Sequence, residues 1–299
     1  MSPAAQNRLL PPQTLASLAN LELVARTAVQ GFLNGLHRSP RFGFSQEFRE
    51  YRAYAEGDDP RFVDWNVYAR TDRTYIRRYE GETNTRLMIL LDASASMGYR
   101  SHSVSKLDYA KFLAAALAYL AARQHDPVGL IVFDEALRQY RPARSHGTSL
   151  QGVIHAIDAV TPGRGTNIDA SFESFREHLT HRGLVAVISD LYCDPASLSA
   201  AVRPLAGNGH DLMIFHVLDP QEVAPHWDES VVLEDSETRE SLNVSPEFLK
   251  EGYRQRLASH LESLRRVTAD AGAHHVLLQT DQPLNEALRH YLTFRQRRA

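Results

Sequence analysis

One carboxylate and two hydroxyls alternate along a short segment of this chain, Asp92-Ala-Ser94-Ala-Ser96. They directly follow residues 87–91, an apolar run of the length and composition of a strand that is buried on both faces. In open α/β sheets, ligands bind at the edge where parallel strands end. Oxygen donors without a nearby Cys or His suit Mg²⁺ or Mn²⁺ and do not suit Zn²⁺. The segment therefore predicts a site for a hard divalent ion at the edge of a sheet.

Two further oxygen-bearing residues follow in a consistent order. Thr166 lies in a loop between two helical patterns, and Asp190 closes another apolar run at residues 184–188. One alternative is that these side chains only cap strand ends, where Asp, Ser and Thr are common. A second alternative is a site with suitable residues that binds no ion.

The five positions together resemble the metal-ion-dependent adhesion site of von Willebrand factor A-type domains. This resemblance implies that Ser94, Ser96 and Thr166 offer hydroxyls, directly or through water, and that Asp92 and Asp190 supply negative charge. It also implies an exchangeable water on Mg²⁺ (or Mn²⁺) that an Asp or Glu of a partner protein replaces. Affinity for the free ion is expected to be modest, because hydroxyls are weak ligands and Mg²⁺ holds its waters tightly.

The surrounding elements are those that such a site requires. From residue 86 onward, apolar strand patterns alternate with helical ones, which predicts an α/β fold with a mostly parallel sheet and helices on both faces. By the resemblance this is a von Willebrand factor A-like, Rossmann-type domain over residues 86–299. Ser105 and Asp108 predict a capping box at the start of a helix that follows the ion-binding segment.

The expected strands are 128–133, an edge strand 137–141, 184–188, 212–217 and 275–279, with a hairpin over 230–244. The expected helices are 149–160, 167–179, 195–206, 246–271 and 284–297. Residues 1–85 are expected to form a small N-terminal α+β extension, which begins with one helix over residues 14–36.

Bulk properties narrow the functional classes. The chain has 299 residues and a net charge of −3, which gives no electrostatic case for nucleic acid or an anionic membrane. Its one cysteine excludes an internal disulfide and fits a cytoplasmic location. No signal peptide is visible, and the longest apolar stretch is too short to span a bilayer directly, which needs about 20 residues.

Residues 36–86 have an unusual composition of ten arginines, no lysine, nine acids and ten aromatics. Arginine without lysine favours fixed, bidentate ion pairs over a diffuse basic patch. One interpretation is a structural network that pins loops against carboxylates. The other is a recognition surface for a partner, in which Arg61, Trp65, Arg70 and Arg77 are the candidate anchors.

The same segment resembles the bacterial family known as domain of unknown function 58. The resemblance rests on Glu47-Phe-Arg-Glu-Tyr-Arg, Gly57-Asp-Asp, Asp64-Trp and Ala69-Arg-Thr, which lead into the Asp92 segment. Members of that family typically occur alongside a MoxR-type AAA+ ATPase. The resemblance implies a partnership with such an ATPase in chaperone-like assembly or remodelling.

Three functions are compatible with these patterns. The leading hypothesis is a non-enzymatic, Mg²⁺-dependent module that binds an acidic residue of a protein ligand. The alternative is a metal-dependent phosphohydrolase that uses Asp92, although such enzymes place a second acid two residues later, where this chain has Ser94. The third is a scaffold in which the ion only makes the loops rigid.

Overall fold

The structure is a computed structural model that describes residues 10–18, 20–36, 48–54, 63–71, 73–79, 86–145, 147–163, 165, 168–226, 230–234, 241–245 and 252–296. Contacts divide the chain into two units, of which the first combines residues 1–32 with 84–298 and the second spans residues 33–83. Each unit is described by itself. The first two helices thus group with the sheet unit and not with the segment that follows them.

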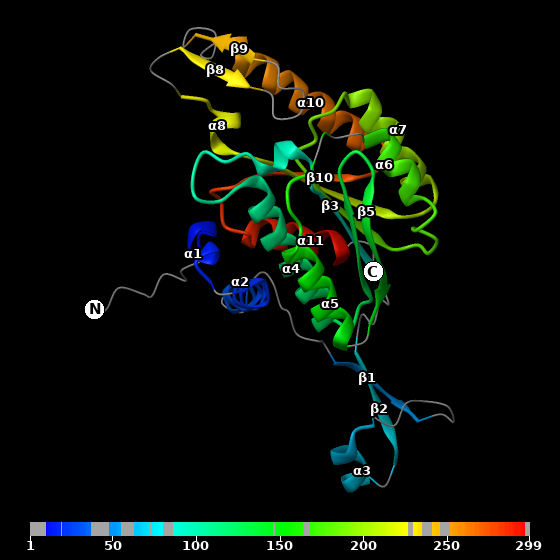
Figure 1. The fold of residues 1–299 in the computed structure, drawn as a ribbon. Helices are drawn as coiled ribbons and strands as arrows, with labels where there is room; N and C mark the ends of the chain where they lie inside the picture. Colours follow the sequence, from blue (N-terminus) through cyan, green and yellow to red (C-terminus); the bar gives the residue numbers. More distant parts are fainter. Residues whose placement is uncertain are drawn as a thin grey trace, which may run out of the picture. The chain divides into compact units, whose positions relative to one another are not determined.

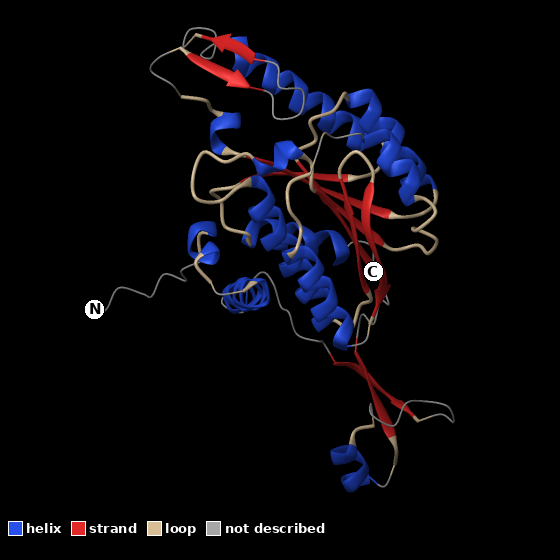
Figure 2. Ribbon diagram, in the orientation of Figure 1, coloured by secondary structure: helices blue, strands red, loops and turns tan. Residues whose placement is uncertain are grey.

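The first unit is built on a six-stranded sheet whose strand order is β10-β7-β6-β3-β4-β5 (Figures 1 and 2). The strands are β3 (Leu87–Asp92), β4 (Val128–Phe133), β5 (Leu137–Arg144), β6 (Leu184–Ser189), β7 (Asp211–Leu218) and β10 (His274–Gln279). Neighbouring strands are parallel except β4 and β5. Every residue of β3, β4 and β6 is buried, as their apolar runs predict for a sheet covered on both faces. The expected mostly parallel α/β fold is confirmed.

Helices cover both faces of this sheet, as Figure 1 shows. One face carries α4 (Lys106–Arg123), α5 (Gly147–Asp158) and α11 (Asn285–Gln296), and α4 contacts both of the other two. The other face carries α6 (Ile168–Phe175), α7 (Pro195–Gly207) and α10 (Arg254–Asp270), which pack in the order α6, α7, α10. Side chains from this second helical layer join those of β3, β4, β6 and β7 in one buried apolar cluster.

Helix α4 begins at a capping box, as its sequence predicts. Ser105 accepts a hydrogen bond from the Asp108 backbone, and the Asp108 carboxylate accepts one from the Ser105 backbone. The helix lies against the sheet on one side and against α5 and α11 on others, so thirteen of its eighteen residues are buried. Its first turn is therefore held firmly beside the strand ends.

The prediction of a single helix over residues 14–36 is wrong. Two helices form instead, α1 (Pro12–Ala16) and α2 (Leu21–Leu36). The break occurs because Asn20 acts as a new helix start, where its side-chain oxygen accepts a hydrogen bond from the Leu23 backbone at 2.7 Å. Both helices bury apolar side chains, including Leu15, Val24 and Val29.

Other boundaries shift by a few residues. Strand β5 continues to Arg144, because its antiparallel pairing with β4 extends to the Val128–Arg144 pair. Helix α6 stops at Phe175, and turns follow it. The expected hairpin is present as β8 (Val231–Glu234) and β9 (Ser241–Val244). A short helix that was not expected, α8 (Pro220–Val223), follows β7.

The second unit contains an antiparallel pair of strands and one short helix. Strand β1 (Phe48–Ala53) pairs with β2 (Tyr75–Tyr79), and α3 (Trp65–Thr71) lies between them in the sequence. Asp64 is buried and accepts a hydrogen bond from the Val67 backbone, which fixes the start of α3. The paired strands belong to the extension that the sequence predicts over residues 1–85, but the helical part expected to begin that extension groups with the sheet unit.

In the described part of the chain, no helix has the length and apolarity needed to cross a membrane.

Candidate metal-ion site

The candidate site lies where the order of the sheet reverses. From β3 the chain moves outward in one direction to β4 and β5, and it then returns to the other side of β3 to form β6, β7 and β10. Helices that leave the carboxyl ends of β3 and β6 therefore diverge to opposite faces of the sheet. Open α/β sheets bind their ligands in the crevice that this divergence creates.

Asp92 is the last residue of β3 and has no exposed surface. Its carboxylate accepts hydrogen bonds from the Ser94 backbone at 2.8 Å and from the Ser189 hydroxyl, at the end of β6, at 2.5 Å. Burial, together with the charge of Asp190, raises the pKa of Asp92 from 3.8 to about 7, although the hydrogen bonds from Ser189 and Ser94 lower it. The side chain is thus firmly held, but its negative charge is poorly compensated.

The two hydroxyls of the segment lie together. Ser94 precedes the 3₁₀ helix η2 (Ala95–Gly98), and this tight turn brings the Ser94 and Ser96 hydroxyl oxygens within 3.1 Å of each other. Both side chains are buried. The alternating spacing therefore produces a pair of oxygen donors directly after the Asp92 carboxylate, as the sequence predicts.

Asp190 directly follows β6 and is also buried, with 1% of its surface exposed. One carboxylate oxygen, Oδ2, accepts a hydrogen bond from a lysine, while the buried oxygen Oδ1 has no hydrogen-bond partner. The next residue, Leu191, has a positive φ of 51°. A left-handed backbone costs a residue other than glycine about 1 kcal/mol, and such strain gathers at functional sites. The loop is therefore held in a conformation that its own residues do not favour.

Thr166 lies outside the described residues, so its position relative to Asp92 stays a prediction. The loop that leads toward it is nevertheless fixed to the candidate site. The backbone of Gly163 donates a hydrogen bond of 2.6 Å to the Ala93 carbonyl, directly after Asp92.

Lys106 belongs to the site, although the sequence analysis did not identify it. This first residue of α4 has no exposed surface, and its ammonium donates to Asp190 Oδ2 at 2.7 Å and to Glu222 Oε1 at 2.7 Å. A signal was present in the sequence, since Lys106 occupies the same helix face as the apolar residues Ala110, Leu113 and Leu117. A lysine on the apolar face of a buried helix requires a buried counter-charge.

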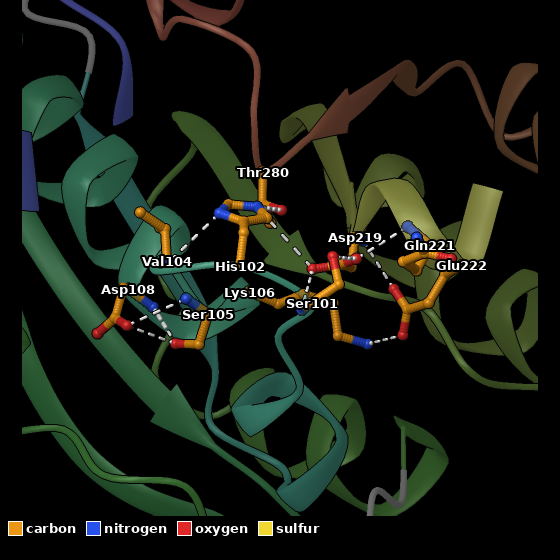
Figure 3. Close-up of polar contacts among 10 residues, drawn as sticks. All are labelled: Ser101, His102, Val104, Ser105, Lys106, Asp108, Asp219, Gln221, Glu222 and Thr280. Carbon is orange, nitrogen blue, oxygen red and sulfur yellow. Dashed lines mark hydrogen bonds and ion pairs between the residues drawn. The ribbon is translucent and has the colours of Figure 1, made fainter. Parts of the chain in front are cut away.

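The segment after β7 supplies two more carboxylates, Asp219 at the start of α8 and Glu222 within that helix. Asp219 is fully buried and accepts hydrogen bonds from the Ser101 backbone, the Ser101 hydroxyl and the Gln221 backbone (Figure 3). Glu222 accepts from the Asp219 backbone at 2.7 Å, which completes a capping box for α8. These contacts join the loop after η2 to the loop after β7.

The chemistry of this set fits a hard divalent cation. Asp92 and Asp190 are buried carboxylates that repel each other, and Asp190 Oδ1 has no partner. A cation between them would compensate both charges, and the hydroxyls of Ser94 and Ser96 add neutral oxygen donors. Among the residues that the structure describes, no three His, Cys, Asp or Glu side chains form a metal-binding group, so such an ion would depend on these hydroxyls.

The proposed partner-binding residues lie in the second unit. Trp65 is 63% exposed on α3 and contacts Tyr68 edge to face at 6.1 Å between ring centroids. Arg70 is exposed in the last turn of the same helix. Arg77 belongs to β2, where it pairs with Tyr51, and Arg61 lies outside the described residues. The described part of this unit thus exposes one aromatic and one basic candidate on the same short helix.

The sequence matches one protein family and several individual proteins. The family described as "Protein of unknown function DUF58" matches residues 50–264. "Uncharacterized protein Rv1480" of Mycobacterium tuberculosis is 27% identical over 276 residues, which cover 91% of this chain and 86% of that protein. "Uncharacterized protein Mb1516" of Mycobacterium bovis matches to the same extent.

Solved structures with a similar fold include BatB from Bacteroides thetaiotaomicron, with a TM-score of 0.48 and 18% identity over 70% of this chain and 97% of that one. The von Willebrand factor A domain of SpRpn10 has a TM-score of 0.41 and 12% identity over 69% of this chain and 94% of that one. These likenesses concern the fold alone.

Proposed function

This chain belongs to the family described as protein of unknown function DUF58, and from that premise we propose that it is a non-enzymatic, ion-dependent protein-binding module. Its binding site would comprise Asp92, Ser94, Ser96 and Asp190, with Thr166 as the fifth residue. The ion would be Mg²⁺ or Mn²⁺, and the protein ligand would present an acidic side chain. We place this activity in the cytoplasm, to which the free thiol of Cys193 is suited.

One observation carries this proposal. Two buried carboxylates, Asp92 and Asp190, meet at the reversal point of the sheet, and Asp190 Oδ1 has no hydrogen-bond partner there. Burial of charges without full compensation is costly, so such an arrangement is retained where a ligand supplies the missing charge. A role in capping the strand ends does not explain this arrangement, because the oxygens of a capping carboxylate would accept hydrogen bonds, whereas Asp190 Oδ1 accepts none.

When bound, the ion would supply a positive centre with exchangeable coordination that an acidic side chain of a partner can enter. The residues of this chain have separate tasks in that arrangement. Ser189 and the Ser94 backbone hold the Asp92 carboxylate, and Lys106 holds one oxygen of Asp190. Ser94 and Ser96 offer neutral donors, so this ligand set leaves coordination positions that an acid from outside can occupy.

We propose a MoxR-type AAA+ ATPase as the working partner. The ground is the resemblance of the segment before β3 to a family whose members occur alongside such ATPases. The exposed side chains of Trp65 and Arg70 on α3 are of the types that anchor protein interfaces, and they would contribute to this contact.

The test combines ion binding with partner binding. Calorimetric titration with Mn²⁺ and with Mg²⁺ is expected to show one weak site in the wild type and none in Asp92→Asn. Binding to a MoxR-type ATPase purified from the same organism, measured with Mg²⁺ and with EDTA, is expected to require both Asp92 and the ion. Asp158→Asn is the matched control, because Asp158 is an exposed acid at the end of α5.

Equal binding of the ATPase in Mg²⁺ and in EDTA would contradict the ion-dependent module and leave the second unit as the recognition surface. Loss of Mg²⁺-dependent stability in Asp92→Asn with intact partner binding would leave the ion a structural role only. Turnover of p-nitrophenyl phosphate by the wild type, abolished in Asp92→Asn, would replace the module with a phosphohydrolase.

A further inference from the structure

Lys106 lies between the candidate ion site and a second acidic group. Its ammonium is equally distant, at 2.7 Å, from Asp190 Oδ2 on one side and from Glu222 Oε1 on the other. Figure 3 shows the Lys106 side chain extending from α4 to Glu222 on α8. One cation is thus shared between a residue of the proposed ion site and a residue of helix α8.

Lys106 is confined to this position. Its ammonium lies 4.6 Å from the ring centroid of Tyr192 and 5.9 Å from that of Tyr99, and it has no exposed surface. Burial alone would lower the pKa of Lys106, but the charges of Asp190 and Glu222 more than offset it, so the net pKa is raised. The geometry therefore places the lysine ammonium inside the site, directly between two carboxylates.

The two acidic partners of Lys106 differ in how they are held. Glu222 also accepts a hydrogen bond from the Asp219 backbone, so it is held independently of the lysine. Asp190 has an unpartnered oxygen and lies beside the Asp92 carboxylate. Of the two bonds that Lys106 makes, the bond to Asp190 is the one that competes with a second cation.

We propose that Lys106 is a built-in counter-cation for Asp190, which limits the affinity of the site for a divalent ion and couples ion binding to α8. This inference rests on the proposed ion site and specifies how that site is regulated. With no divalent ion, Asp190 relies on Lys106 for compensation. With an ion present, Asp190 shares its charge with it, and Lys106 strengthens its pairing with Glu222.

The coupling acts in both directions, because linkage between two sites is reciprocal. A contact that draws Glu222 or α8 away from Lys106 leaves the lysine to Asp190 and weakens ion binding. A contact that pulls Lys106 toward Glu222 strengthens it. Helix α8 thereby controls the ion affinity of the site, although it contributes none of the proposed ligands.

Two substitutions with opposite expected effects test this inference. Lys106→Met keeps the length of the side chain and removes its charge, so Mn²⁺ affinity in calorimetric titration is expected to rise by about tenfold or more. Glu222→Gln leaves Lys106 entirely to Asp190, so the affinity is expected to fall by a similar factor. Hydrogen–deuterium exchange of residues 219–226 is expected to change on Mn²⁺ addition in the wild type and not in Lys106→Met.

The matched control is Lys111→Met, which removes the same charge from the same helix. Lys111 is partly buried and donates to the Asp158 carbonyl instead of to the site. Its replacement is expected to change Mn²⁺ affinity by less than about threefold, since an unshared charge at greater distance is better screened. Equal effects of Lys106→Met and Lys111→Met would overturn the inference, because overall charge would then explain both.

The other possible results with the Lys106 and Glu222 variants also support or overturn the inference. Wild-type ion binding that is unchanged in Lys106→Met would overturn the inference and leave the proposed function intact. If Lys106→Met does not fold, Glu222→Gln decides, and unchanged or tighter Mn²⁺ binding in that variant would overturn it. If Mn²⁺ binds to Lys106→Met but not to the wild type, Lys106 itself takes the place of the ion beside Asp190. That result would support Lys106 as the counter-cation and show that the wild type does not depend on an ion. No binding in any variant would overturn both proposals.

Discussion

At the scale of single residues, Asp92 has the clearest consequence. A carboxyl whose pKa is raised to about 7 binds more protons in the folded state than in the unfolded state between pH 3.8 and 7. The unfolding free energy of the ion-free protein is therefore expected to fall as the pH rises through this window. Above pH 7 the full destabilisation by the ionised Asp92 carboxylate is present. The cost follows from burial beside Asp190 without enough positive charge.

Asp92→Asn is expected to remove that cost. In EDTA at pH 8 the variant should be more stable than the wild type by up to about 4 kcal/mol, and it should lose the stabilisation that Mg²⁺ gives the wild type. Urea unfolding at pH 5 and pH 8, with and without Mg²⁺, measures both effects. A variant that is less stable at pH 8 and still responds to Mg²⁺ would show that Asp92 is not the strained ligand.

A pair of histidines on neighbouring strands gives a second pH dependence of opposite sign. His216 Nδ1 on β7 lies 3.3 Å from His275 Nε2 on β10. Burial is the main cause that lowers the pKa of His216 to about 3, and the His275 ring is the next cause. Burial, followed by the charges of Arg265 and His274, lowers the pKa of His275 to about 4. The folded state thus resists protonation of both rings, and stability is expected to fall as the pH drops below 6.5.

His275→Gln is expected to reduce this acid sensitivity. One ring with these folded and unfolded pKa values accounts for about 2 kcal/mol between pH 7 and pH 5. Thermal unfolding at the two pH values should show a smaller loss in the variant, while the two proteins keep parallel curves above pH 7. An equal loss in both proteins would mean that His275 is not an acid-sensitive group.

The candidate site shows which residues sequence reasoning can identify. Asp92, Ser94, Ser96 and Asp190 were predicted because strand ends and hydroxyl spacing are local properties. Lys106 was missed because a lysine normally marks a solvated helix face, and its two acidic partners follow it by more than eighty residues in the chain. Only the sheet topology brings those partners to it.

At the scale of elements, the strands were predictable because buried parallel strands are uninterrupted apolar runs. The start of a helix was predictable where two residues cap each other's backbone, as Ser105 and Asp108 do in their capping box. The break between α1 and α2 was not, because the apolar spacing continues across it and Asn20 alone marks it. The length of β5 depends on its pairing with β4, which a single strand's sequence does not contain.

The contact between β4 and β5 gives a prediction at this scale. A Cβ at Gly129 would lie 2.7 Å from Met88 Cε and 2.8 Å from backbone atoms of both Arg141 and Ala143. The register is irregular at this point, since the pairing shifts between Val128 and Leu130. Gly129→Ala is expected to force β5 away from β4 and to cost about 1–3 kcal/mol of unfolding free energy.

Gly31→Ala is the matched control, because a Cβ at Gly31 meets no atom within 4 Å. Alanine in the middle of α2 is expected to add about 0.5–1 kcal/mol of stability. Urea unfolding of both variants tests the pair. Two variants of equal stability would show that the close approach of β5 to Gly129 relaxes without cost.

At the scale of the whole molecule, the division into two units predicts separable functions. Trp65 is largely exposed in the second unit, so its loss should not disturb the sheet of the first. Trp65→Ala is expected to leave Mn²⁺ affinity and thermal stability unchanged and to weaken binding of the proposed ATPase partner by about tenfold or more. Calorimetry and a binding assay on the same preparation measure these properties.

A change in Mn²⁺ affinity in Trp65→Ala would show that the two units are energetically coupled, since energetically independent sites have additive effects. Unchanged ATPase binding would instead assign the aromatic side chain a role other than recognition. The two results can be distinguished because Trp65 belongs to the second unit and the residues of the candidate ion site belong to the first.

Strand β5 has a consequence for how the protein behaves during synthesis and at high concentration. The six-stranded sheet ends at this strand on one side, and no described strand pairs with its outer edge. It carries an irregular register, an exposed proline at position 142 that lacks a backbone donor, and exposed arginines at positions 138 and 144. Each of these features disfavours the addition of a further strand. At high concentration these features are therefore expected to disfavour strand pairing at this edge of the sheet.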